Sequence, residues 1–389
     1  MSNLLSKASI LLTPTATSNG KLHNVKPNTT TGDFTFTRAT TATRVNSNGL
    51  IESVASGLPR IDFTGGTGQV LLEPASTNAS KNSENTSSWT YIEFGSGSAG
   101  TITTGKTDMF GGTNAVQIDF PADAENVAIR FGQTTSSISS GTVTMSIYAK
   151  LVQSGSKTLR FRANTSQNLV IDSTEFVRYE ATVTKGSSEA FSLKLRPSQG
   201  TSSGGFSIIL CHPQEEAQSF ATSYIPTTGT DATRNKDEAN SAGDTSLINS
   251  TEGVLYAEIS ALADDTIQRA ISLSNSTIQN TVEIFYNSGS NQLSFRIRAN
   301  NTNVTVQNRT VSDRTQFIKV ALKYKSGDIE GFINGVKEVD RTDSFTFSGN
   351  LSELAFDRGG AQSFFEGKIK TIAVFKEALT DAQLISLTS

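Results

Sequence analysis

The sequence predicts an all-β protein, with an extended N-terminal arm followed by two antiparallel β-sandwich (jelly-roll) domains and one short C-terminal helix. Three observations predict this class. The apolar runs are short and rich in Val, Ile and Phe, and segments of Ser, Thr, Asn and Gly separate them. Within these runs apolar and polar residues alternate, as they do in strands with one buried face. A capped helical pattern closes the chain after the last strand pattern.

The composition narrows the class of protein further. A chain of 389 residues is long enough for two or three domains, each with its own core. Only 18% of the residues are charged and the net charge is -3, so there is no overall positive field to attract nucleic acid. No segment approaches the roughly 20 apolar residues of a membrane span, and the run Ile10-Leu11-Leu12 is shorter than a secretory signal requires. One cysteine, Cys211, excludes an intramolecular disulfide, so we expect synthesis in a reducing cytoplasm.

Residues 1–80 are predicted to form the arm. Short strand patterns occur at Asp33–Thr40, Arg60–Thr64 and Val70–Pro74, with Asn48-Gly49 and Gly65-Gly66 as turns between them. Such a segment buries little apolar surface by itself. We therefore expect it to dock on another subunit, on another protein or on the domain that follows it.

Residues 81–232 are predicted to form the first sandwich. Alternating apolar positions define its inner faces, as in the pair Ile129 and Phe131 and in the run Val143, Met145 and Ile147. Residues 233–250 are polar and lack periodicity, which is typical of a linker.

Residues 251–389 are predicted to form the second sandwich. Alternation from Ile318 to Tyr324 predicts a strand with one dry and one wet face. Asn334-Gly335 supplies the two positive-φ positions of a type I′ hairpin turn. Thr380 and Gln383 form a capping-box pattern at the start of the last helix, with Leu379 and Leu384 placed as a hydrophobic staple.

Three groups of segments resemble parts of known families. Asp33–Glu52, Pro59–Phe63 and Leu71–Asn78 resemble the N-terminal part of bacteriophage fibre and other virion surface proteins. Ser83–Thr90 and Ala221–Thr227 resemble the two ends of a carbohydrate-binding-module-like jelly roll. The hairpin at Ile329–Val339 and the strand and helix at Val374–Leu387 resemble the end of a LamG-like, concanavalin A-like domain.

The resemblance implies a bacteriophage structural protein on the virion surface, as a component of a fibre, spike or appendage, made in the host cytoplasm. It implies adhesion to host-surface glycans and attachment to other virion proteins through the arm. Because the arm buries little surface by itself, we also expect a homo-oligomer such as a trimer. The charge, the hydropathy and the lack of a catalytic pattern predict no nucleic-acid partner, no membrane insertion and no enzyme activity. Two other functions stay open: a purely structural capsid or tail decoration protein, and a polysaccharide depolymerase.

Basic residues on the first sandwich are the candidate contacts for a glycan or a neighbouring subunit. They alternate with core positions and therefore point outward, and on neighbouring strands they would form a ladder of guanidinium groups suited to acidic sugars. A solvated sheet surface is the alternative reading. With one added tyrosine, the candidates are Arg130, Tyr148, Arg160, Arg162, Lys194 and Arg196. Trp89, the one tryptophan, is predicted to be a core residue and not a platform for sugar rings.

No catalytic residues are predicted. The nearest match to the carboxylate pattern of retaining glucanases, Glu338-Val339-Asp340, lacks the final Glu and lies on the solvent side of a hairpin. Two histidines, His23 and His212, make neither a triad nor a zinc site. No cofactor is expected. Because LamG-like domains often bind calcium, the resemblance leaves loop carboxylates as candidate ligands: Asp264, Asp265 and Asp357.

Overall fold

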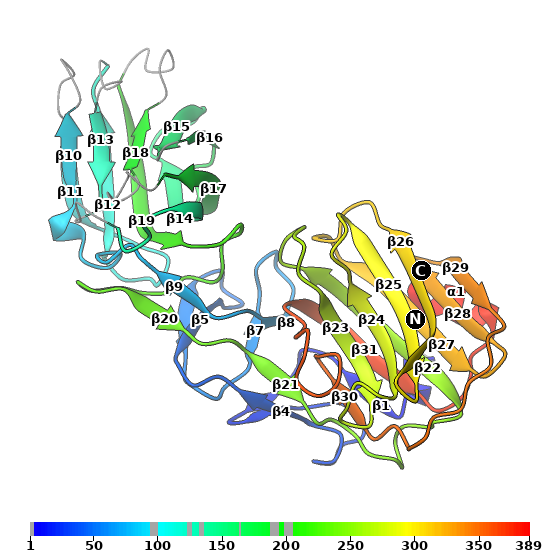
Figure 1. Ribbon diagram of the computed structural model, residues 1–389. Helices are drawn as coiled ribbons and strands as arrows, with labels where there is room; N and C mark the ends of the chain where they lie inside the picture. Colours follow the sequence, from blue (N-terminus) through cyan, green and yellow to red (C-terminus); the bar gives the residue numbers. More distant parts are fainter. Residues whose placement is uncertain are drawn as a thin grey trace.

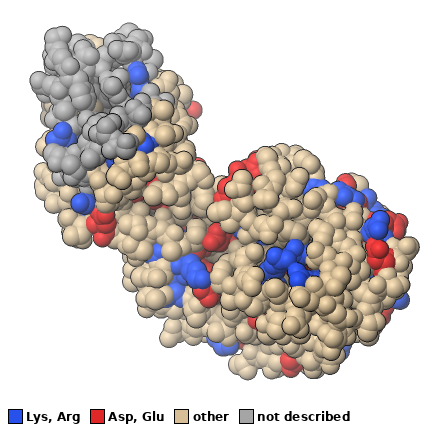
Figure 2. Space-filling view, viewed as in Figure 1, with Lys and Arg blue, Asp and Glu red and all other residues tan. Residues whose placement is uncertain are grey.

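Strands form nearly all of the regular structure, and they build two sandwiches that make separate lobes in Figure 1. The computed structural model describes residues 4–93, 100–122, 127–131, 136–162, 165–186, 194–197 and 205–389. It confirms the predicted all-β class. Within these ranges the helical segments are α1 (Asp381–Thr388) and two short 3₁₀ helices, η1 (Leu5–Lys7) and η2 (Thr86–Ser88). Figure 2 shows acidic and basic side chains scattered over one face of both lobes.

The first sandwich consists of two five-stranded antiparallel sheets. One sheet has the order β10 (Thr90–Glu93), β13 (Val127–Arg130), β18 (Lys194–Pro197), β15 (Lys157–Arg162) and β16 (Ser166–Ile171). The other has the order β11 (Thr101–Lys106), β12 (Ala115–Phe120), β19 (Phe206–Glu216), β14 (Gly141–Leu151) and β17 (Val177–Lys185). The alternating positions predicted to face inward are buried between them, including Ile129, Phe131, Val143, Met145 and Ile147.

The two ends of this sandwich meet, although they are far apart in the sequence. The Ser83 and Thr227 hydroxyl oxygens are 2.7 Å apart, and the Tyr224 hydroxyl donates to Ser83 Oγ at 2.6 Å. Trp89 is 4% exposed, packs edge to face on Phe131 at 5.0 Å and donates its indole N–H to the Asn82 carbonyl. The prediction of a core tryptophan is therefore confirmed.

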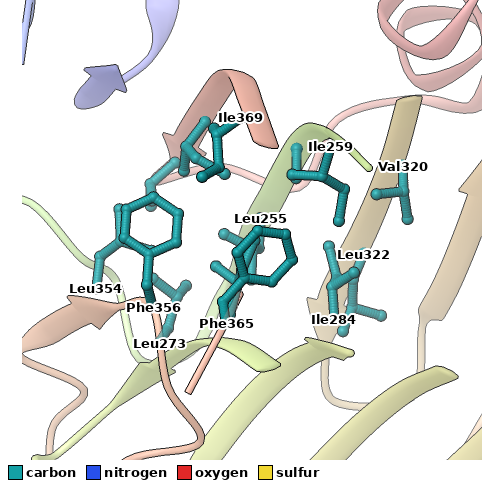
Figure 3. Packing of buried hydrophobic residues seen from close by; sticks show 14 of the residues in the cluster. Leu255, Ile259, Leu273, Ile284, Val320, Leu322, Leu354, Phe356, Phe365 and Ile369 are labelled. Atoms are coloured by element: carbon teal, nitrogen blue, oxygen red, sulfur yellow. The ribbon is translucent and has the colours of Figure 1, made fainter. Parts of the chain in front are cut away.

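The second sandwich pairs a five-stranded sheet with an eight-stranded sheet. The five-stranded sheet has the order β26 (Thr302–Thr310), β25 (Gln292–Ala299), β24 (Thr281–Tyr286), β23 (Arg269–Ser274) and β30 (Glu353–Ala355). The C-terminal strands of the eight-stranded sheet are β29 (Val336–Arg341), β28 (Ile329–Ile333), β27 (Ile318–Lys325), β22 (Glu252–Ala261) and β31 (Gly367–Phe375). Figure 3 shows apolar side chains from both sheets, such as Leu255, Leu273 and Leu322, packed in the core between them.

Residues 1–80 complete this second sandwich. Strands β1 (Ile10–Leu12) and β8 (Gln69–Leu72) both pair with β31, and β7 (Arg60–Asp62) pairs with β8. The structure therefore shows the arm docked on the second sandwich, whereas the one intrachain partner that the sequence left open was the domain directly following the arm. Ile10, Leu12, Val70 and Leu72 join its apolar core, which explains how so short a segment is held in place.

Residues 233–250, predicted to be a linker, also carry strands. The residues of β20 (Ala232–Arg234) pair with β9 (Ser76–Asn78), and β21 (Glu238–Asn240) pairs with β4 (Phe34–Thr37). The remaining arm strands are β2 (Thr17–Ser18), β3 (Lys21–Leu22), β5 (Ala42–Val45) and β6 (Ile51–Val54). The difference from the prediction arises because β20 and β21 each pair with a segment more than 150 residues away, which local periodicity does not reveal.

The end of the chain follows the predicted local chemistry, with one difference. Asn334 and Gly335 have φ values of 46° and 83°, and the Thr380–Gln383 capping box is present. The predicted wet face of the large sheet is largely covered, because α1 packs there through Leu384 and Leu387. Lys323, expected on that wet face, is 5% exposed and forms ion pairs with Asp328 and Glu330.

Candidate functional site

Five of the six predicted contact residues lie on one sheet of the first sandwich. Strand β18 lies between β13 and β15, which places Arg130 opposite Lys194, and Lys194 opposite Arg162. Arg160 is the register partner of Arg196. The side chains of Arg162, Lys194 and Arg196 lie outside the described residues, so the structure brings their backbone positions together and says nothing of their contacts.

Arg130 and Arg160 are partly exposed on this sheet. Their Nε atoms are buried and have no hydrogen-bond partner among the described residues. The role of this face in binding a glycan or a subunit stays a prediction.

Tyr148, the sixth predicted residue, lies on the other sheet and belongs to a different site. It is 7% exposed, on β14, and packs with Ile51 from the arm and with Cys211 and Tyr224. Burial raises the pKa of its hydroxyl, so this group is neutral and is able to donate and accept a hydrogen bond. The six residues therefore do not form one surface.

Tyr148 lines a pocket of about 770 Å³ where three parts of the chain meet. The first wall is formed by the arm between Thr43 and Gly66, and the second by Tyr148 and by residues 176–180 of the first sandwich. The third comes from Leu262, Thr315 and Lys368 of the second sandwich. This volume falls within the usual range for sites that bind small molecules and sugars.

One side of the pocket is aromatic and basic. The Arg178 guanidinium carbon lies 5.6 Å from the centre of the Tyr148 ring, and Arg178 donates to Ser146 Oγ at 2.8 Å. Its Nε is buried without a hydrogen-bond partner in the described part of the chain. Phe176 and Phe63 also line the pocket, from the first sandwich and the arm respectively. Aromatic rings beside hydrogen-bonding groups suit a sugar, which has an apolar face and a rim of hydroxyls.

Two of the carboxylates that line this pocket, Asp62 and Glu73, are engaged by the protein, whereas Glu180 is exposed. Asp62 accepts hydrogen bonds from the backbone N–H groups of Val45 and Thr64. Burial alone would raise the pKa of Glu73, but Arg234, Arg60 and Ser223 outweigh it and hold that pKa well below its usual range. Glu73 is therefore ionised, and it orders the pocket wall by accepting from the Ser223 N–H and hydroxyl at 2.7 and 2.6 Å.

The three candidate calcium ligands do not meet in one site. Asp264 is paired with Arg314 at 2.7 Å and Asp265 with Arg269 at 2.5 Å. Asp357 is buried on the loop after β30, where burial, with Glu353 and Glu238 nearby, raises its pKa to about 6. In the part of the chain that the structure describes, no group of three or more His, Cys, Asp or Glu side chains is arranged to hold a metal ion.

The sequence did not identify this pocket. Tyr148 was a candidate, but Asp62 and Phe63 lie in the arm, and Arg178 was not singled out. The one sequence feature that pointed to this region was the Gly65-Gly66 turn. Its residues have φ values of 88° and 86° and line the pocket. That turn shows where the arm bends but not what it faces.

Residues 238–385 match the concanavalin A-like lectin/glucanases superfamily. This segment is therefore a LamG-like domain, and the match begins at β21, within the predicted linker. No curated protein matches the chain. No helix in the described ranges is both long enough and apolar enough to cross a lipid bilayer.

Several solved structures are similar in part. The CBM40 module of the Ruminococcus gnavus IT-sialidase, bound to α2,3-sialyllactose, is 16% identical, with a TM-score of 0.33 over 38% of this chain and 92% of that one. Domain 4 of AbnA, a GH43 arabinanase from Geobacillus stearothermophilus, in complex with arabinotriose, is 15% identical. Its TM-score is 0.32 over 44% of this chain and 83% of that one.

Proposed function

We propose that this chain is a non-enzymatic structural protein of a bacteriophage virion surface that binds host-surface glycans through the pocket around Tyr148. It would serve as a component of a fibre, spike or appendage. The observation that carries the proposal is the pocket itself. Its walls bring Tyr148, Phe176 and Phe63 together with the Arg178 guanidinium, and these are the groups that recognise a sugar's apolar face and hydroxyls.

The match of residues 238–385 to lectins and glucanases supports carbohydrate recognition over other roles. Within that superfamily, the pocket favours binding over hydrolysis. A retaining or inverting hydrolase needs one carboxylic acid that is protonated near neutral pH. Of the carboxylates that line the pocket, Glu73 is held ionised by Arg234 and Arg60 and therefore does not supply that acid.

The virion location rests on the segments in residues 33–78 that resemble phage surface proteins. In this proposal the outer surface of the arm binds other virion proteins, and the protein is a homo-oligomer such as a trimer. Multiple copies on one particle would raise avidity without new contacts, since each bound site increases the effective concentration of the next.

The first test is binding of the purified protein to an array of bacterial surface polysaccharides. We expect saturable binding that the same free polysaccharide abolishes. Tyr148→Phe and Phe63→Ala, which alter opposite walls of the pocket, should each weaken binding by about tenfold or more. Val170→Ala is the control, because Val170 is 53% exposed on β16 and does not line the pocket.

Absence of binding across the array, or binding that both pocket variants leave unchanged, would contradict the proposal. Release of oligosaccharides from a bound polysaccharide would show a depolymerase instead. Labelling of intact phage particles with an antibody against this chain tests the virion location. We expect label at the particle surface. Unlabelled particles, with the protein found only in the cytoplasm of infected cells, would contradict the virion location.

A further inference from the structure

The five-stranded sheet of the second sandwich carries a polar layer on the face turned away from the core. Ile284, Phe295 and Ile297 point inward, so the residues between them point outward. Across this outer face, Ser272 on β23 is the register partner of Glu283 on β24, and Glu283 is the partner of Arg296 on β25. Arg298 lies two residues further along β25, on the same face.

Three arginines gather around one carboxylate on this face, and we call them the arginine cluster: Arg296, Arg298 and Arg358. Arg296 forms an ion pair with Glu283. Arg358 reaches in from the loop after β30 and places its Nε 3.7 Å from the same Glu283 oxygen. Arg298 is bonded to the neutral amide oxygen of Asn301. Arg296 and Arg358 therefore share one fully buried carboxylate, and the third charge, on Arg298, is bonded to a neutral group.

The guanidinium groups of the cluster have unused hydrogen-bonding capacity. The Nε atoms of Arg296, Arg298 and Arg358 are all buried, and none has a hydrogen-bond partner in the described residues. The Ser272 hydroxyl, which is fully buried beside Glu283, also has no hydrogen-bond partner among the described residues. Arg296 is 6% exposed and its guanidinium carbon lies 4.5 Å from the centre of the Phe285 ring, so the Phe285 ring packs against this guanidinium group.

The charges themselves indicate an excess of positive potential. Burial, followed by the neighbouring Arg296 and Arg298, lowers the pKa of Arg358, and Glu283 compensates only in part. Figure 2 shows a compact group of Lys and Arg side chains near the middle of the C-terminal lobe, surrounded by uncharged atoms. Buried like charges repel unless a counterion joins them, so the cluster is suited to receive an anion.

We infer that the arginine cluster binds the carboxylate of an acidic sugar, as a second glycan site separate from the Tyr148 pocket. This inference rests on the proposed function, since it assumes that the protein binds glycans. A planar carboxylate accepts two parallel hydrogen bonds from a guanidinium group, so a partly exposed arginine of the cluster is suited to bind one. Arg298 and Arg358 are the partly exposed members of the cluster, so they are the ones that an incoming carboxylate would reach.

The test uses galacturonate, glucuronate and mannuronate oligomers, each beside its methyl ester, in calorimetric titrations with the full chain. We expect at least one acid to bind and its ester not to bind, because the ester lacks the negative charge. Arg358→Gln and Arg298→Gln should each weaken this binding by about tenfold or more, and Arg358→Lys should restore it only in part. Arg341→Gln, which removes the same charge from the exposed strand β29, is the control and should bind as the parent does.

Failure of this inference is distinguishable from failure of the proposed function. Equal binding of acid and ester, binding of sulfated oligosaccharides alone, or unchanged affinity in both glutamine variants would overturn the arginine cluster as a carboxylate site. If Tyr148→Phe still weakens array binding in that case, the proposed function stands. Thermal unfolding of each variant shows whether a loss of binding reflects a loss of fold, and the partly exposed Arg298 provides a variant outside the buried Glu283 ion pair.

Discussion

Arg38 donates a hydrogen bond of 3.0 Å to Asp237, which lies 199 residues further along the chain, and both side chains are fully buried. Arg60 pairs with the other oxygen of the same carboxylate and also with Glu73. Arg234 lies 3.4 Å from Glu73. This buried network joins the arm to residues 233–240, and through Ser223, bonded to Glu73, it reaches the end of the first sandwich.

Removing the charge at the centre of this network should be costly. Asp237→Asn leaves three buried guanidinium groups with one carboxylate fewer, and we expect a loss of about 3–5 kcal/mol in the free energy of unfolding. Urea denaturation followed by circular dichroism measures it. The control is Lys236→Ala, at the residue before Asp237. It removes a partly exposed ion pair with Glu238 and should change the free energy of unfolding by at most about 1 kcal/mol. Similar losses in the two variants would show that the network contributes no more than a surface pair.

Asp357 should make stability depend on pH in the acidic range. Its pKa is raised to about 6 by burial and by Glu353 and Glu238, from an ordinary value of 3.8. Between about pH 4 and pH 6 the folded state keeps a proton that the unfolded state releases, so the free energy of unfolding falls as the pH rises through this window. Asp357→Asn removes this dependence and should be about 2–3 kcal/mol more stable than the parent at pH 7, with no gain at pH 4.

Urea titrations at several pH values check this expectation, and an Asp357→Asn variant that is less stable than the parent at pH 7 would contradict it.

The Asp357→Asn variant also tests whether Asp357 is a calcium ligand. A rise in melting temperature on adding calcium, seen in the parent and lost in Asp357→Asn, would assign this aspartate as a ligand.

The capping box should contribute measurably to the C-terminal helix. The Thr380 N–H donates to Gln383 Oε1 at 2.9 Å, and the Gln383 N–H donates to Thr380 Oγ1. Thr380→Ala should lower the free energy of unfolding by about 1 kcal/mol, whereas Thr380→Ser keeps the hydroxyl and should stay close to the parent. Thermal unfolding of the three proteins compares them. Equal losses for Ala and Ser would mean that the threonine methyl group, and not the cap, stabilises the helix.

Trp89 should matter for stability and not for sugar binding. Trp89→Phe removes the indole donor to the Asn82 carbonyl, which keeps the Asn85 N–H as a donor, and leaves a cavity beside Phe131, so we expect a loss of about 1–3 kcal/mol. Binding to the polysaccharide array should be unchanged at a temperature where the variant is folded. Lost binding with unchanged stability would instead identify Trp89 as a sugar platform.

Local chemistry could be predicted well from the sequence. The Asn334-Gly335 turn, the capping box and the alternating core positions such as Met145 and Ile147 depend on neighbours a few residues away. The outward orientation of the basic residues on the first sandwich could also be predicted, because alternation along a strand decides which residues point outward. Their register opposite one another, as for Arg160 and Arg196, required knowledge of which strands are neighbours.

The sequence by itself determined an all-β chain with two sandwiches and a capped terminal helix, because strand alternation, turn residues and caps act over short distances. Only the tertiary structure decided that the arm pairs with β31, that residues 233–240 are strands, and that Tyr148 faces the arm across a pocket. It also decided that Arg358 joins Arg296 and Arg298. Each of these contacts joins segments far apart in the sequence, and their pairing depends on the packing of the whole chain, which no local pattern encodes.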